Sequence, residues 1–482
     1  MGRRARLHAG LAAWLERRGG GRAELAPLIA HHYAESIRPE LADIAWSGEE
    51  QRAVSLRKSA RHWLRRAAEL AFARYEMKDA ADLFAQAAGL AGSDAERVEM
   101  WLQAARASQE RFDMDRFRRE MERAIDSARG RAEAELWARL ALEGSRPYMW
   151  RQPPRQDEVE RWIAKALDDP DASTWARARA LAARAILHPA EGERDGQEAL
   201  RLAEELGDPG LIGYAAEALL TSATLAGELE RACEYADRSV ATVRRQAEHD
   251  HDREAGRYMI AAFTYLRRGL IAEGRRFAEQ LDGVAARLTP HHEVHGVAVL
   301  MLVETLACDW VAAGGLTARA EAAATANADT PCQFNWRMLL MAALARAELG
   351  DAGEAERLEE RASAAASMGG PFEKEPSLIR LALVRRDLGA AERLVAANPE
   401  LDIYDIDYPA ARLDAFLALR DRERAEAEAP AALSVGGYTE PFALRALGGL
   451  REERPLVERA AARFEELGLS RRAAETRALL SR

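Results

Sequence analysis

Apolar residues recur along this chain at spacings of three and four, with charged residues between them, as expected for amphipathic helices. Two such segments and a short turn form a unit that returns every 33 to 42 residues. One position in the second segment is usually Ala or Gly, the size needed where two helices approach closely. We assign this anchor position to Ala80, Phe117, Val159, Ala199, Ala232, Gly274, Ala313, Ala355, Ala391, Ala425 and Ala460. The period predicts an all-α solenoid of about eleven stacked helical hairpins with a superhelical, tetratricopeptide-like arrangement.

The first clear repeat shows the packing logic. Leu64, Ala68, Ala80, Phe84 and Ala87 have the large-small-small-aromatic-small spacing of a tetratricopeptide repeat. Small side chains allow the paired helices to approach, and the aromatic ring fills the space beside them. The sequence therefore predicts antiparallel helix pairs.

Turn residues mark the joints of the later repeats. We expect Gly227, Gly269 and Gly350 to close first helices in the left-handed conformation. The pairs at 208–209 (Asp-Pro) and 289–290 (Thr-Pro) mark joints between hairpins.

Residues 1–50 precede the repeats. They predict an amphipathic helix over 3–18, a second helix over about 23–38, and a polar loop over 39–50.

The array itself is expected to occupy residues 51–482. Two stretches, 145–157 and 399–409, interrupt its rhythm with prolines, aspartates and tyrosines. Each is either a border of a ligand site or an insertion at a repeat joint.

The overall charge and the cysteines narrow the class of protein. The net charge of −10 makes nucleic acid an unexpected partner. The basic excess within residues 1–70 is interpreted as a solvated helix face, or alternatively as a contact for an acidic domain or nucleic acid. Cys233, Cys308 and Cys332 form no CxxC pair, and no apolar run approaches the ~20 residues of a membrane span. We therefore expect a cytoplasmic protein with reduced thiols.

Motifs for catalysis are weak. The sequence contains no GxxxxGK[ST], GxGxxG or GxSxG, so we expect no enzyme and no cofactor. His291 and His295 share a helix face at i, i+4, where a metal could bridge them. His292 lies between them, but the sequence identifies no third ligand, and Thr289-Pro290 indicates a helix start here. We expect no metal site.

Several segments resemble a family of bacterial signalling ATPases. They are ELAPLIAHHYAESIRPELADIAW (24–46), WLRRAAELAFARYEMKDAADLFAQAAGL (63–90), PYMWRQPP…VERWIAKAL (147–167) and EPFALRALG…AAARFEELGLSRRAAETRALL (440–480). The chain resembles the C-terminal tetratricopeptide-like region of AAA/STAND regulators, which carry an adenylate- or guanylate-cyclase-like or LuxR-type head. The resemblance implies a separated C-terminal gene product, a truncated reading frame or a fragment. It also implies that the helices of residues 1–50 are the remnant of an ATPase-proximal domain. ATP hydrolysis and nucleotide cyclisation are not transferred to it.

The repeat register also predicts a binding surface. In a tetratricopeptide hairpin, certain first-helix positions ahead of the anchor line the concave face. In this chain they are Tyr148, Arg184, Glu217, Met259, Phe263, Arg267, His295 and Arg337. This mixture of polar, cationic and apolar residues fits an extended peptide or a partner helix, unless several of them pack against the next hairpin instead.

These observations favour a non-catalytic regulatory or sensor module. It would bind a protein, a peptide or a small-molecule effector, normally coupled to an ATPase, cyclase or transcription-regulator head. The alternatives are a constitutive protein-protein scaffold and an enzyme with an unrecognised site.

Overall fold

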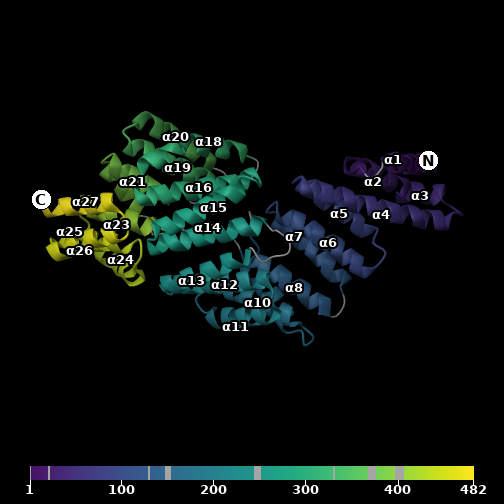
Figure 1. Cartoon of the computed structure of the whole chain (residues 1–482), viewed down its shortest axis with the longest axis horizontal. Coiled ribbons are helices and arrows are strands. Elements are labelled where there is room, and N and C mark those ends of the chain that lie inside the picture. Colours follow the sequence, from purple (N-terminus) through teal and green to yellow (C-terminus); the bar gives the residue numbers. More distant parts are fainter. Residues whose placement is uncertain are drawn as a thin grey trace. The chain divides into compact units, whose positions relative to one another are not determined.

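The computed structural model describes most of the chain as α-helix. The residues described are 2–19, 22–128, 131–146, 153–243, 251–328, 332–366, 376–396 and 406–481. Within them there are 27 α-helices and no β-strand (Figure 1). The all-α class is therefore confirmed. Tyr148 lies outside the described residues, as do residues 147–152 and 399–405 of the two irregular stretches.

The chain divides into two compact units, which are considered separately. Unit 1 comprises residues 1–188 and 198–206, and unit 2 comprises residues 189–197 and 207–482. The helices of unit 1 are α1 (Gly2–Gly19), α2 (Ala26–Ser36), α3 (Pro39–Ala45), α4 (Glu50–Ala73), α5 (Met77–Gly89), α6 (Asp94–Gln109), α7 (Met114–Ser127), α8 (Arg131–Gly144), α9 (Gln156–Leu167) and α10 (Thr174–Leu187). Helix α11 (Glu193–Leu206) has residues in both units.

Unit 2 contains the remaining helices. They are α12 (Pro209–Leu225), α13 (Leu229–Val243), α14 (His251–Arg268), α15 (Ile271–Ala285), α16 (Pro290–Ala307), α17 (Trp310–Gly315), α18 (Thr317–Ala326), α19 (Gln333–Glu348), α20 (Ala352–Ala366), α21 (Pro376–Val384), α22 (Leu388–Ala396), α23 (Tyr408–Leu419), α24 (Arg422–Val435), α25 (Glu440–Arg451), α26 (Arg454–Glu466) and α27 (Ser470–Arg477). From α14 onward the first helices of successive hairpins pack side by side, in the order α14, α16, α19, α21, α23, α25.

The eleven predicted anchor residues all lie in second helices, and all are buried. The predicted series of about eleven hairpins is thereby confirmed. Gly274 on α15 shows why the position must be small. A Cβ atom there would lie 2.6 Å from the side chain of Leu266 on α14. A larger residue would force the paired helices apart.

The segment 39–50, expected to be a loop, contains helix α3 at Pro39–Ala45, so that expectation is wrong. Pro39 occupies the first turn, where its missing N–H costs nothing. Ala42, Ala45 and Trp46 pack into a small core with α1, and the Trp46 indole donates a 2.8 Å hydrogen bond to the carbonyl of Ser36. Tertiary packing thus stabilises a helix too short to be predicted from its polar sequence.

Most of the described turns within the hairpins share one geometry. Gly227, Gly269 and Gly350 have φ values of +77°, +87° and +87°, which confirms the predicted left-handed turns. Non-glycine residues take the same left-handed conformation at six other turns. These are Tyr75, Phe112, Cys308, Arg386, Arg420 and Glu452. Each of these residues costs about 1–2 kcal/mol relative to ordinary backbone. Because none of them is glycine, the sequence gives no signal for these turns.

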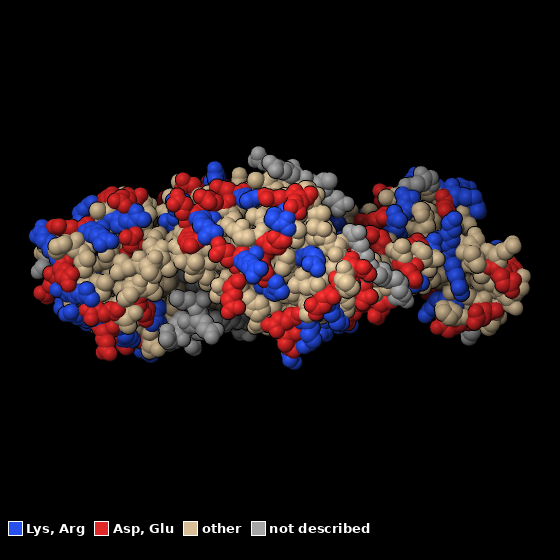
Figure 2. Space-filling model, turned by 90° about the horizontal axis from the view of Figure 1, so that it is seen from below, with Lys and Arg blue, Asp and Glu red and all other residues tan. Residues whose placement is uncertain are grey.

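Arginine-carboxylate pairs join neighbouring second helices. Examples are Arg116–Asp82, Arg118–Glu158, Arg231–Glu193, Arg357–Glu321 and Arg424–Glu392, at 2.7 to 3.0 Å. Each is partly exposed and contributes only about 0.2–1 kcal/mol. On the face drawn in Figure 2, basic and acidic side chains accordingly intermingle over most of the surface.

In unit 2 the last hairpins contact the turns of much earlier ones. The Tyr438 N–H donates to the carbonyl of Arg267 at 2.9 Å, and Arg471 pairs with Glu348 at 2.6 Å. Leu467 packs against the turn at Gly269. These contacts connect residues more than a hundred positions apart, so unit 2 is stabilised beyond nearest-neighbour stacking.

Candidate ligand site on helices α14, α16 and α19

Three successive first helices contribute rings to one cluster. Phe263 on α14 stacks on Phe334 of α19, with centroids 6.4 Å apart and planes inclined by 28°. His295 on α16 meets the same Phe334 edge-to-face at 4.8 Å. Phe263 is buried, whereas His295 and Phe334 keep part of their surface exposed. The cluster therefore offers an aromatic surface that spans three hairpins.

The start of α16 positions the histidines. Thr289 is the N-cap, and its hydroxyl accepts a hydrogen bond from the His292 N–H. Pro290 follows as the first helical residue, which places His291 in the first turn and His295 one turn later on the same face. The His292 ring is held apart, because its Nδ1 lies 2.7 Å from the Thr289 hydroxyl.

Cys332 is the N-cap residue of α19 and is held by two asparagines. Its backbone N–H donates to Oδ1 of Asn335 at 3.1 Å, and the thiol lies 3.7 Å from the same oxygen. The Asn327 side-chain amide donates to that oxygen at 2.9 Å. Because both asparagines are buried, these bonds fix the position of the cysteine.

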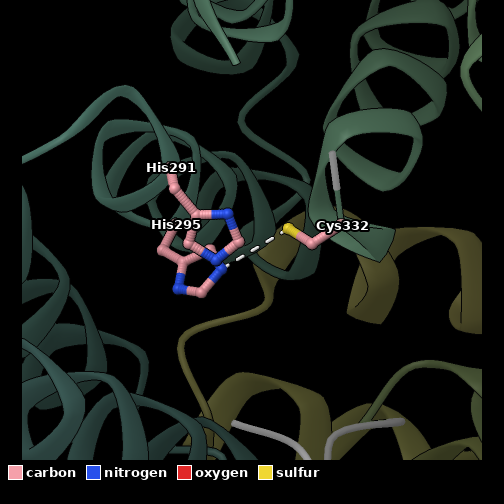
Figure 3. Close-up of side chains that lie close together, drawn as sticks. All are labelled: His291, His295 and Cys332. Atoms are coloured by element: carbon pink, nitrogen blue, oxygen red, sulfur yellow. Dashed lines mark hydrogen bonds between the residues drawn. The ribbon is translucent and has the colours of Figure 1, made fainter. Parts of the chain in front are cut away.

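The two helix starts bring His291, His295 and Cys332 together (Figure 3). One potential ligand atom from each lies within 4.8 Å of the others, and the Cys332 Sγ is 3.5 Å from the His295 Nε2. Burial, and then the neighbouring His291 and His292, hold the pKa of His295 well below its usual 6.5. Its imidazole is consequently neutral near pH 7, with a nitrogen lone pair available.

The predicted groove residues of unit 2 differ in how accessible they are. Met259 and Phe263 are buried in the hydrophobic core, with 7% and 5% of their surface exposed. Glu217 is also buried; it pairs with Arg257 at 3.4 Å and accepts a hydrogen bond from Ser239. These three side chains therefore pack between helices, which is the alternative to lining the groove that the sequence left open.

The three predicted arginines are partly exposed on their helices, with Arg184 on α10 of unit 1. Arg267 lies in the last turn of α14, and Arg337 on α19 places its guanidinium 5.6 Å from the ring of Trp336. Of the predicted set, the structure brings Phe263 and His295 together through Phe334. Their role in binding stays a prediction.

Phe334 and Cys332 were missed in the sequence. A signal was available, because Cys332 follows His295 by 37 residues, which is one repeat period. Residues one period apart fall on neighbouring first helices, where side chains can meet. From the sequence, Cys332 was interpreted as an isolated cysteine and no third potential metal ligand was found beside His291 and His295. In the structure, the Cys332 sulfur lies beside these histidines.

None of the helices in the described ranges has the length and hydropathy needed to cross a membrane.

Comparison with known proteins gives distant structural similarity only. No family model and no curated protein matches the chain. It is similar to a Signal Transduction ATPase with Numerous Domains that has a tetratricopeptide repeat sensor, from Pyrococcus horikoshii (13% identity, TM-score 0.42, 71% of this chain and 52% of that one). A Rap protein complexed with Competence and Sporulation Factor is also similar (12%, 0.44, 76% and 99%), as is the APC/C hetero-tetramer Cut9-Hcn1 (12%, 0.39, 97% and 94%). The chain thus spans about half the length of the archaeal ATPase.

Proposed function

We propose that this chain is a regulatory module that binds a protein or peptide on helices α14, α16 and α19. The observation that carries the proposal is the cluster of Phe263, His295 and Phe334, contributed by three successive first helices. A ligand that packs on the exposed parts of His295 and Phe334 contacts neighbouring hairpins at once. Arg267 and Arg337 are partly exposed on the same helices and could contact the ends of such a ligand.

The mechanism follows from this placement. A ligand that touches several hairpins binds best to one relative arrangement of those hairpins and raises the population of that arrangement. In the bacterial regulators that the sequence resembles, such a shift would be passed to an ATPase, cyclase or transcription-regulator head. A small-molecule effector would act in the same way if it bridged the same helices.

Selection of peptide ligands tests the proposal. A displayed random peptide library is screened against the purified chain, and the affinities of enriched peptides are measured for the wild type and for Phe334→Ala. We expect Phe334→Ala to weaken binding by about tenfold or more, since a buried aromatic anchor contributes 2 kcal/mol or more.

The matched control is Val311→Ala on α17, an apolar residue with 74% of its surface exposed. It should leave the affinity unchanged, and circular dichroism should show the same helicity for both variants. If no peptide is enriched, or if the selected peptides bind equally well to Phe334→Ala, the proposed site is wrong.

Hydrogen exchange separates a sensor from a constitutive scaffold. For a sensor, peptide binding should change amide exchange in helices that do not touch the peptide, such as α12 and α23. For a scaffold, the change should stay within α14, α16 and α19. We also expect the purified chain not to hydrolyse ATP, and turnover that follows the protein through purification would contradict a non-catalytic role.

A further inference from the structure

The starts of helices α16 and α19 present three donor groups to a common point (Figure 3). His291 and His295 provide imidazole nitrogens from one helix face, and Cys332 provides sulfur from the N-cap of the next first helix. Imidazole and thiolate are the donors that zinc prefers. Two histidines at i, i+4 form a common helical chelate for this ion.

The distances fit a tetrahedral ion. Bonds of about 2.0–2.1 Å to nitrogen and about 2.3 Å to sulfur place two zinc ligands about 3.5 Å apart. The Cys332 Sγ and the His295 Nε2 are 3.5 Å apart, and the whole set lies within 4.8 Å. Small side-chain rotations would therefore bring His291 into range without moving the helices.

The surroundings also suit a metal site. Asn335, itself held by Asn327, fixes the backbone of Cys332. Phe334 packs against the His295 ring and shields one side of it from water. The positive end of the α19 dipole favours a thiolate at its N-cap. Fixed outer contacts of this kind orient the ligands of metal sites.

We propose that His291, His295 and Cys332 bind one zinc ion that links the starts of α16 and α19. Three protein donors leave the fourth tetrahedral position for water or for a group from a bound partner, as in zinc sites that keep an open position. The inference goes beyond the proposed function and does not depend on it. His295 belongs to both sites, but the tests are separate: failure to select a peptide would not exclude the zinc site, and failure to bind cobalt would not exclude the peptide site.

Cobalt(II), a spectroscopic substitute for zinc, provides the test. The purified full chain is titrated with cobalt under reducing conditions, and zinc is then added in competition. We expect one equivalent to produce the thiolate-to-cobalt charge-transfer absorption in the near ultraviolet, and zinc to abolish it. This absorption requires a sulfur ligand, so metal at the other close histidine pair, His8 and His32, cannot produce it.

Variants assign the absorption to the site. Cys332→Ser should remove it, and His295→Gln should weaken cobalt binding by about tenfold or more. Cys233→Ala is the matched control, because burial raises the pKa of that thiol to about 11 and it lies on α13, away from the cluster. Absence of the absorption from the wild type, or its persistence in Cys332→Ser, overturns the proposal. The proposal is also overturned if the chain binds copper(I) but does not bind zinc.

A measurement on the unmodified protein covers the possibility that Cys332→Ser does not fold. Zinc should slow alkylation of Cys332 by iodoacetamide by about tenfold or more, as followed by peptide mass spectrometry. An alkylation rate that is the same with and without zinc contradicts the site.

Discussion

The sulfur of Cys332 lies 3.5 Å from Nε2 of His295, although 37 residues separate them in the sequence. That separation equals one repeat period, and stacking of hairpins converts it into a direct contact. The Arg231–Glu193 pair, 38 residues apart, follows the same rule on second helices. Pairs of side chains one period apart therefore connect neighbouring hairpins.

Overpacking an anchor position should destabilise the array. Ala232 on α13 is fully buried against α12, so Ala232→Phe should lower the free energy of unfolding by about 1–3 kcal/mol. Urea unfolding followed by circular dichroism measures the loss. Ala241→Phe, on the exposed side of the same helix, should change stability by less than about 0.5 kcal/mol. Equal effects of the two substitutions would show that the repeat register is wrong.

The buried carboxylate of Asp414 should make unit 2 sensitive to acid. Burial alone would raise its pKa, but Arg445, Arg380 and Arg472 together bring it below the usual 3.8. The ionised form therefore stabilises the fold above pH 3.8, and this contribution is lost as the pH falls from there through the lower native pKa.

Asp414→Asn should remove that contribution. It should cost about 3–5 kcal/mol near pH 7, because Arg380, Arg445 and Arg472 lose the buried carboxylate that they share. Urea midpoints measured from pH 7 to pH 3 should also fall less steeply than in the wild type. Glu423→Gln, at an exposed position on α24, should keep the wild-type profile. An unchanged slope in Asp414→Asn would exclude Asp414 as a source of acid sensitivity.

Adding a methyl group at Gly437 should weaken the contact between the last hairpins and α14, and so lower the stability of unit 2. Gly437 has a φ of +66°, and a Cβ atom there would lie 2.4 Å from the carbonyl oxygen of Arg267. Gly437→Ala should cost about 1–2 kcal/mol for the left-handed backbone and about 1–3 kcal/mol more for the clash.

Gly468→Ala is the control for the backbone cost. Its φ is +75°, and nothing lies within 4 Å of the added carbon. It should lose only the first contribution in the same urea measurement. If both variants lose the same stability, the contact at Gly437 does not stabilise unit 2.

The hairpins could be predicted because their determinants are local and periodic. Most anchor residues, such as Ala232 and Gly274, are small because paired helices touch there, so a single spacing in the sequence locates the second helices. Helix α3 could not be predicted, since its stability comes from the packing of Ala42 and Ala45 on α1. The left-handed turns at non-glycine residues could not be predicted for a similar reason, because tertiary contacts offset the cost of their backbone conformation.

The site was only partly predictable. Periodicity identifies the face of a helix but not how deeply its side chains are buried. Glu217 and Met259 were therefore expected to line the groove, whereas both are buried between helices. The one sequence signal for the convergence of Phe334 and Cys332 on His295 is their spacing of about one repeat period, which places residues on neighbouring helices but does not fix their contact.

The most direct test of the proposed function is a crystal structure of the chain bound to a peptide selected from the library. The account predicts that the peptide packs on His295 and Phe334 and contacts helices α14, α16 and α19 together. A peptide bound elsewhere, with Phe334 still covered only by its present neighbours, would contradict the assignment of this surface.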